Sequence, residues 1–301
     1  MSDDVRTVAP SIGSRLSQLA ELPGTDRARE LASLGRSWLG EGAPSLTDDE
    51  RAAVVKTLLD VVSEGAGSAR ERLTVGAALG LLGDPRLLLP EDDAYWATVE
   101  LDEGPIQFGR YLVTNREFRR FVDAGAYDDD AVWASIEGGL AWRDGAEARW
   151  PDLASQAESR PFVVDNQPVV GVTWFEAAAY AAWAGARLPD FEERLYAVRG
   201  REKRPYPWGA PFGEGNANTQ EEVLGQPTAV GLYLRDRSPE GIYDLAGNVA
   251  EWCADGVDGE RWAHPGAWDQ PSMSAWAKAR VLETPDSLSP ALGFRLARDH
   301  S

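Results

Sequence analysis

Two carboxylates stand close together in the stretch DLAGNVAE, in which Asp244 is the first residue and Glu251 is the last. Gly247 lies between them and favours a turn that would bring the two ends together. Carboxylates and the backbone carbonyl oxygens of such a turn are the ligands that a hard cation such as Ca²⁺ prefers. The spacing therefore makes this stretch a candidate cation site.

The residues that hold softer metals or act as nucleophiles are scarce. The chain has one cysteine, Cys253, and two histidines, His264 and His300. A single cysteine forms no intrachain disulfide, thiolate zinc cluster or two-cysteine redox site. Two histidines offer little material for a multi-histidine metal centre or a histidine-dependent triad. We interpret Cys253 as a small buried hydrophobe and His264 as a loop residue.

The overall charge argues against polyanionic partners. The 301 residues include 49 acidic and 30 basic side chains, for a formal net charge of −19 at pH 7. This field repels phosphate backbones and anionic lipid surfaces, so we expect no nucleic-acid partner and no membrane-surface binding. No apolar run reaches the roughly 18 residues of a membrane span, and the first residues lack the pattern of a secretory signal. We expect a cytoplasmic protein.

Residues 1–90 form the first of two expected domains, an N-terminal helical module. Thr47 is followed three residues later by Glu50, which is a capping-box pattern, and apolar residues then recur at helical spacing as far as Gly65. A later helix is expected to end at the turn formed by residues 83–85. Helices that end in such a GDPR turn resemble HEAT-type repeats; the alternative is a small helical cap packed on the next domain.

Residues 91–301 form the second expected domain. Short strands, turns and many tryptophans replace the long helices beyond Pro90. Large rings among many glycines indicate a loop-rich domain with an aromatic core. The fold class predicted for the chain is α+β.

Six short motifs, collinear along roughly residues 105–298, resemble the formylglycine-generating, sulfatase-modifying domain, which is an elaborated C-type lectin fold. The motifs are YLVTNREF (111–118), PVVGVTWFEAAAY (168–180), WAGARLP (183–189), YPWG (206–209), GIYDLAGNVAEW (241–252) and GFR (293–295). The resemblance implies a C-type-lectin-like domain of the formylglycine-generating-enzyme type. A fold alone does not fix a function.

The resemblance also implies two kinds of metal chemistry. The oxidases of this family hold copper with two cysteines, and a sulfoxide-forming branch uses a histidine-rich iron site. Cys253 is the sole cysteine and follows the G-N-x-x-E-W motif, away from the C-terminal segment in which the copper cysteines would fall. Two histidines cannot supply the iron site. We therefore expect that the chain is no enzyme and has no redox cofactor.

In the resembled family, the loop with the two carboxylates holds calcium. Carried over position by position, the ligands are the Asp244 side chain, the Gly247 and Val249 carbonyls and the Glu251 side chain. A structural calcium ion is one expectation. The alternative is that Glu251 pairs with a buried arginine such as Arg295, while Asp244 or Asn248 shapes the turn.

Residues 264–301 resemble the C-terminal cassette of variable proteins of diversity-generating retroelements, which a mutagenic reverse transcription rewrites. The cassette would span residues 266–295, and Pro265 and Ala267 depart from the usual Gly and Ser. The positions of its fixed frame are Gly266, Trp268, Ala275, Ala277, Ala279, Arg280, Pro285, Asp286, Leu292, Gly293, Phe294 and Arg295.

Between the frame positions lie residues of mixed chemistry, which we call the variable positions. They are Asp269, Gln270, Pro271, Ser274, Trp276, Lys278, Val281, Leu282, Glu283, Ser287, Ser289, Pro290 and Ala291. No periodicity organises them and no catalytic arrangement is recognisable among them, whereas a binding surface needs only a rigid scaffold with a mixture of side chains. They therefore indicate a ligand-binding surface; the alternative is an ordinary surface loop.

The frame and the variable positions make opposite structural predictions. Trp268 and Phe294 should be buried, and Arg280 and Arg295 should point inward. Six variable positions should share one contiguous exposed face: Asp269, Gln270, Trp276, Lys278, Val281 and Glu283.

The function that we expect is that of a non-catalytic ligand-binding protein that displays a diversified C-terminal surface on a lectin-like scaffold. The ligand would be a protein or another macromolecule, and a further partner would dock on the helical module. Two alternatives are a metal-dependent oxidase of the formylglycine-generating family and a peptide-sensing adaptor in a bacterial signalling or conflict system.

Overall fold

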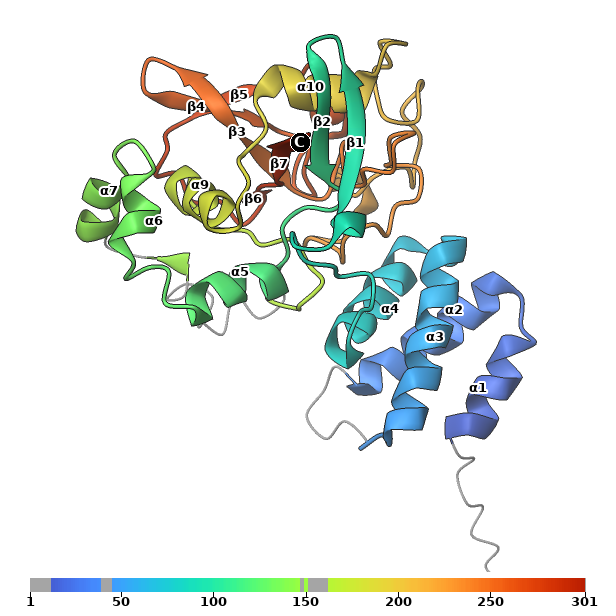
Figure 1. Ribbon diagram of the computed structural model, residues 1–301. Coiled ribbons are helices and arrows are strands. Elements are labelled where there is room, and N and C mark those ends of the chain that lie inside the picture. Colours follow the sequence, from blue (N-terminus) through green and yellow to red (C-terminus); the bar gives the residue numbers. More distant parts are fainter. Residues whose placement is uncertain (1–11, 39–44, 147–148, 151–161, 301) are drawn as a thin grey trace, which may run out of the picture. The chain divides into compact units, whose positions relative to one another are not determined.

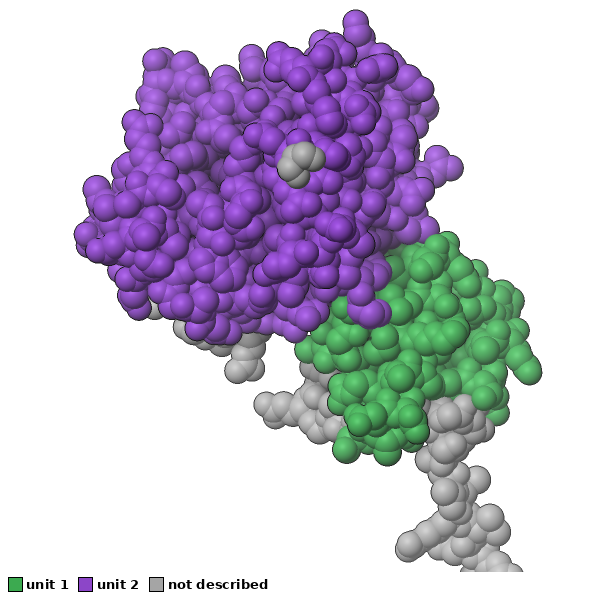
Figure 2. Space-filling model, in the orientation of Figure 1, with its two compact units in different colours: residues 1–84 green, residues 85–301 purple. Residues whose placement is uncertain are grey.

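The computed structural model describes residues 12–38, 45–146, 149–150 and 162–300. The chain divides into two compact units, Met1–Asp84 and Pro85–Ser301, which Figure 2 colours green and purple. None of the described helices combines the length and the apolar composition that crossing a membrane requires.

The first unit is helical. Its helices are α1 (Ile12–Ala20), α2 (Gly24–Trp38), α3 (Asp48–Glu64) and α4 (Ala69–Leu82). Thr47 caps α3 and Ser68 caps α4, and each exchanges hydrogen bonds with the glutamate three residues later, so the capping box predicted at Thr47 is present. The helices bury one another's apolar residues, among them Leu31, Val54, Leu58 and Leu79.

The second unit contains two sheets (Figure 1). The strands of the first sheet, in the order β1-β2-β7, are β1 (Trp96–Leu101), β2 (Gly104–Gly109) and β7 (Ala297–Asp299). Those of the second, in the order β5-β4-β3-β6, are β5 (Val281–Glu283), β4 (Glu260–His264), β3 (Ala250–Val257) and β6 (Leu292–Gly293). Among the strand pairs of the described residues, the β3–β6 pair is parallel and the other pairs are antiparallel.

Short helices surround these sheets. They are η1 (Asp93–Tyr95), α5 (Asn115–Asp123), α6 (Asp130–Ala134), α7 (Gly139–Gly145), α9 (Trp174–Trp183), α10 (Phe191–Arg199), η3 (Gln220–Glu222) and η4 (Ser272–Ala275). Helices α5, α9 and α10 each begin with a full capping box, so local sequence fixes where they start. With mixed helices and sheets, the architecture is α+β, as predicted.

The core of the second unit is aromatic. Phe118, Tyr180 and Phe294 contact one another, with ring centroids 5.6 to 6.2 Å apart. Phe118 comes from α5, Tyr180 from α9 and Phe294 from the residue after β6, so three distant segments meet there. Phe294 is the frame residue predicted to be buried, and it is completely inaccessible to solvent.

Candidate functional site

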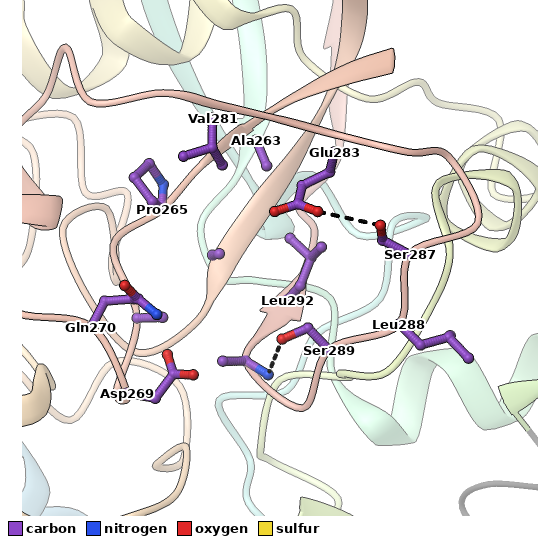
Figure 3. A pocket seen from close by; sticks show the side chains of 13 residues that line it. Ala263, Pro265, Asp269, Gln270, Val281, Glu283, Ser287, Leu288, Ser289 and Leu292 are labelled. Carbon is purple, nitrogen blue, oxygen red and sulfur yellow. Dashed lines mark hydrogen bonds between the residues drawn. The ribbon is translucent and has the colours of Figure 1, made fainter. Parts of the chain in front are cut away.

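A groove of about 270 Å³ opens on the four-stranded sheet (Figure 3). Each strand of this sheet supplies part of its lining, namely Ala250 from β3, Ala263 from β4, Val281 and Glu283 from β5, and Leu292 from β6. The two segments that flank these strands supply the rest: Pro265, Ala267, Asp269, Gln270, Ser287, Leu288, Ser289 and Ala291. The C-terminal segment therefore builds most of this groove.

Variable and frame positions differ in exposure where they alternate. Ala275 and Ala277 of the frame are buried, whereas Trp276 and Lys278 between them are exposed. Among the thirteen variable positions, only Ala291 is buried. The variable positions in the groove lining are Asp269, Gln270, Val281, Glu283, Ser287, Ser289 and Ala291.

The six residues expected on one face are brought together in part. Asp269, Gln270, Val281 and Glu283 line the groove. The side chain of Trp276, with an exposed fraction of 46%, and that of Lys278 are also accessible but do not line it.

Two frame glycines are required by close backbone approaches. A Cβ atom on Gly266 would lie 2.3 Å from the carbonyl oxygen of Ala246, and one on Gly293 would lie 2.4 Å from that of Val169. Both distances are far below normal contact, so the chain around the groove approaches its scaffold at points where only glycine fits.

Two frame side chains are placed differently from the prediction. Trp268 is only partly buried, because it packs at the edge of a core cluster and not inside it. Its indole stacks on Phe162 and donates a hydrogen bond to the Pro290 carbonyl at 3.3 Å. Arg280 is exposed and does not point inward, since its guanidinium lies over the Trp262 ring, 4.3 Å from the centroid. Arg295, in contrast, is fully buried as predicted.

Backbone hydrogen bonds fix the walls of the groove to other elements. Three such bonds run from Gly171 N to Ser289 O at 2.9 Å, from Trp174 N to Pro285 O at 2.9 Å, and from Gln220 N to Gln270 O at 2.9 Å. They hold both flanking segments in place without a ligand, so the groove is preformed.

The groove combines apolar walls with acidic groups. Figure 3 shows Asp269 and Gln270 on one side and Glu283 and Ser287 on the other. Glu283 Oε2 accepts a hydrogen bond from the Ser287 hydroxyl at 3.2 Å. Asp269 Oδ1 is buried and has no hydrogen-bond partner among the described residues. The lining contains no lysine, arginine or histidine.

In the loop from Asp244 to Glu251, for which a structural calcium ion was one expectation, two arginine side chains pair with the Glu251 carboxylate. Glu251 Oε1 accepts a hydrogen bond from Arg194 Nη2 at 2.6 Å, and its Oε2 accepts one from Arg295 Nε at 2.6 Å. All three side chains are buried. Burial alone would raise the pKa of Glu251, but the charges of Arg194 and Arg295 outweigh it and lower the pKa to about 2. Two guanidinium groups thus supply the positive charge that a cation would bring.

The other expected calcium ligands are engaged in part, because Asp244 Oδ1 is buried and has no hydrogen-bond partner among the described residues. Asp244 Oδ2 accepts a hydrogen bond from Gly231 N at 2.8 Å, and the Gly247 carbonyl accepts one from Val249 N at 3.0 Å. Asp244 has a φ of 56° and Asn248 one of 72°, so both shape the turn. The Glu251–Arg295 pair of the alternative is therefore present, and calcium binding stays a prediction.

The single cysteine and the first histidine are core residues. Cys253 is fully buried, as predicted, and burial raises the pKa of its thiol well above the usual range. His264 is not a loop residue, because it is the last residue of β4 and its side chain is fully buried. Both ring nitrogens form hydrogen bonds with the backbone. Its Nε2 lies 3.1 Å from the Trp276 carbonyl, and its Nδ1 accepts a hydrogen bond from Gly266 N at 3.3 Å. Burial lowers its pKa to about 3, so the imidazole is neutral.

These donors do not fit either metal site that the resemblance describes. Within the described part of the chain, no group of three or more His, Cys, Asp or Glu side chains could hold a metal ion. Cys253 has no second cysteine to pair with, and both ring nitrogens of His264 are occupied. We derive no reaction step through copper or iron.

Sequence analysis missed Leu288 as a groove residue. Its side chain is exposed to 47% and lines both the groove and a second hollow of about 510 Å³. The second hollow is bounded by Leu288, Ala141, Trp142, Gly145, Ala146, Thr173 and Asp286. A large apolar residue between Ser287 and Ser289, inside a run of variable positions, was the available signal.

Comparison with known proteins reveals one family. The profile of the Sulfatase-modifying factor enzyme 1-like domain (FGE-sulfatase) matches residues 89–300. The Formylglycine-generating enzyme of Thermomonospora curvata is 32% identical over 74% of this chain and 91% of its own length. The Hercynine oxygenase of Mycolicibacterium thermoresistibile is 39% identical over 50% of this chain and 36% of its own length. The C-type-lectin-like fold of the formylglycine-generating type is thus confirmed.

The solved structures include Treponema denticola variable protein 1, which is similar over 65% of this chain and 85% of its own, with a TM-score of 0.45 and 18% identity. The curated relatives correct two expectations. They are named as an enzyme and an oxygenase, so the expectations of no enzyme and of no redox cofactor are wrong as inferences from this family.

Proposed function

We propose that this chain, which belongs to the Sulfatase-modifying factor enzyme 1-like family, binds a ligand in the groove that its C-terminal segment, residues 266–295, forms on the four-stranded sheet. We further propose that a retroelement varies the variable positions of this segment, seven of which line the groove.

The observation that carries this proposal is the separation of roles along the segment. Seven of the twelve frame residues are buried, among them Ala277, Phe294 and Arg295, whereas Ala291 alone is buried among the thirteen variable positions. A segment with this division can change its surface residues without changing its packing, which is what a diversified binding surface needs.

Exposed apolar side chains support the same surface. The large hydrophobic residues that are exposed among the described residues are Leu81, Leu140, Val223, Val257, Met273, Trp276, Val281 and Leu288. Half of them fall between residues 273 and 288, although this stretch is a small part of the chain. Exposed apolar residues that gather in one segment mark binding sites.

A selection experiment tests the proposal. A library of random dodecapeptides displayed on phage is selected against the full chain, and each peptide is then tested against Val281→Trp, which places a large ring in the groove. Val257→Trp is the matched control, because Val257 lies on β3 outside the groove and is similarly exposed, at 42% against 37% for Val281.

Selected peptides should lose binding to Val281→Trp and keep binding to Val257→Trp. Peptides that bind both variants equally well would contradict a ligand site in the groove. The variation of the segment has its own test, since a nearby reverse-transcriptase gene and an adenine-rich near-copy of codons 266–295 should accompany the gene. A gene without such a copy would contradict that part of the proposal.

A further inference from the structure

We propose that the groove recognises a cationic group, namely the alkylammonium or guanidinium group of a lysine or arginine side chain in a ligand peptide. This inference rests on the proposed function, because it names the ligand chemistry of the same groove. It is carried by the charges, the unpaired oxygen and the apolar walls of the groove, together with the second hollow beside it.

The groove contains negative charge without a counter-charge. Asp269 and Glu283 project into it from opposite sides, and its lining has no basic residue (Figure 3). Arg261 is the partner of Glu283 in the β4–β5 register, but its guanidinium lies over the Trp174 ring, 4.0 Å from the centroid, and does not line the groove. A ligand cation would meet two carboxylates that the groove itself leaves uncompensated.

The Asp269 carboxylate is incompletely paired within the protein. Asp269 Oδ1 is buried and has no hydrogen-bond partner among the described residues, whereas Glu283 already accepts from Ser287. A buried acceptor without a donor is unfavourable, and an ionised N–H group forms the strongest hydrogen bond with a carboxylate. Because Oδ1 is closed to solvent, a ligand cation would approach the part of the Asp269 carboxylate that lines the groove and would stabilise its charge there.

The walls suit the stem of a basic side chain. Ala263, Val281 and Leu292 add apolar surface to the groove that holds the two carboxylates. Lysine and arginine place their methylene groups along such surface while the charged end reaches polar partners. A small inorganic cation would use only the carboxylates and would leave these walls without contact.

The second hollow indicates that the cation belongs to a longer ligand. Leu288 lines both cavities, so they adjoin at this side chain. The second cavity also carries a carboxylate, Asp286, beside Trp142. An extended peptide can place a basic residue in the groove and a neighbouring residue in the second hollow, whereas a free amine would fill the groove alone. The net charge of −19 would also steer a basic peptide toward the chain.

The test uses the selected peptides that lose binding to Val281→Trp. The double variant Asp269→Asn/Glu283→Gln should bind them at least about tenfold more weakly than the wild type. The matched control is Asp102→Asn/Glu103→Gln, which makes the same change of charge at two exposed residues of the β1–β2 turn. Replacing the peptide's arginine by citrulline, or its lysine by norleucine, should reproduce the loss and add nothing to the double variant.

The outcomes separate the two proposals. Groove-dependent peptides that bind the double variant as tightly as the wild type would overturn cation recognition and leave the proposed function intact. A selection without any peptide sensitive to Val281→Trp would overturn the proposed function and this inference together. Putrescine serves as the free amine: if equimolar putrescine displaced the peptides, the assignment to a peptide side chain would be wrong.

Discussion

Arg194 Nη2 lies 2.6 Å from Glu251 Oε1 inside the lectin-like domain, and neither side chain is accessible to solvent. Arg295 Nε contacts the other carboxylate oxygen at 2.6 Å, so one glutamate is held between two guanidinium groups. Arg295 belongs to the cassette frame, and Arg194 belongs to α10. This pairing attaches the end of the C-terminal segment to a helix about a hundred residues earlier in the sequence.

Glu251→Gln should destabilise the fold strongly at neutral pH. The substitution leaves two buried guanidinium groups without their shared carboxylate, a loss of about 3–5 kcal/mol. Urea unfolding measures it. Glu91→Gln is the control, because Glu91 pairs with Arg120 at an exposed site and its loss should cost about 1 kcal/mol or less. Equal losses in the two variants would contradict a buried network.

The Glu251 network also has a pH dependence of defined sign. Its pKa is about 2 in the folded chain and 4.5 in the reference state, so the folded form favours the ionised carboxylate. Its contribution to stability is complete above about pH 4.5 and is lost as the pH falls toward 2.

Glu117 should give the pH dependence of stability the opposite sign, with a loss of stability as the pH rises. Burial raises its pKa from 4.5 to about 7 despite hydrogen bonds from Thr114, and its Oε1 has no hydrogen-bond partner among the described residues. Its contribution is complete below about pH 4.5 and is lost as the pH rises through 7, by up to about 3 kcal/mol. Glu117→Gln keeps the capping box and should remove this fall.

Unfolding free energies measured from pH 4.5 to 8 test the Glu117 prediction. The wild type should lose stability relative to Glu117→Gln as the pH rises. Glu50→Gln, in the exposed capping box of α3, is the control and should leave the shape of the profile nearly unchanged. Parallel profiles for wild type and Glu117→Gln would show that this carboxyl is already ionised at low pH.

Gly293→Ala should destabilise the cassette frame. The added methyl would lie 2.4 Å from the Val169 carbonyl oxygen, so the chain must shift, at a cost of about 1–3 kcal/mol. Gly145→Ala is the control, because no atom lies within 4 Å of its added Cβ. Thermal melts compare the two. A Gly293→Ala variant as stable as the control would mean that the close approach is easily relaxed.

Local sequence patterns correctly predicted features that depend on neighbouring residues, such as helix starts and buried motif positions. The capping box at Thr47 follows from residue types three positions apart, and the buried Phe294 follows from its motif. Glu251 was assigned two alternative partners, a cation and Arg295, because a carboxylate in a turn suits both. The structure pairs Glu251 with Arg295 and also with Arg194, which no local pattern connects to Glu251.

Positions that depend on distant partners were predicted less well. Arg280 was expected to point inward, but the Trp262 ring from the neighbouring strand holds its guanidinium at the surface. His264 was assigned to a loop, but the carbonyl of Trp276 gives its ring a buried partner. In both residues the deciding contact joins separate segments of the chain, and spacing along the sequence does not predict which segments meet.

Phe294→Ala and Gln270→Ala should differ sharply in their effect on stability. Phe294 is fully buried against Phe118 and Tyr180, so truncation leaves a cavity and should cost about 3–5 kcal/mol. The Gln270 side chain lines the open groove, where water replaces it, so its loss should stay within about 0.5 kcal/mol.

Urea unfolding of both variants, with Lys278→Ala as a second exposed variable position, measures this contrast. The frame carries the packing of the segment, so the surface between frame residues should be replaceable without unfolding the chain. If Gln270→Ala lost as much stability as Phe294→Ala, the groove wall would be part of the core, because its side chains would then be needed to hold the fold. A segment of that kind could not vary its surface, and the proposed binding function would lose its structural basis.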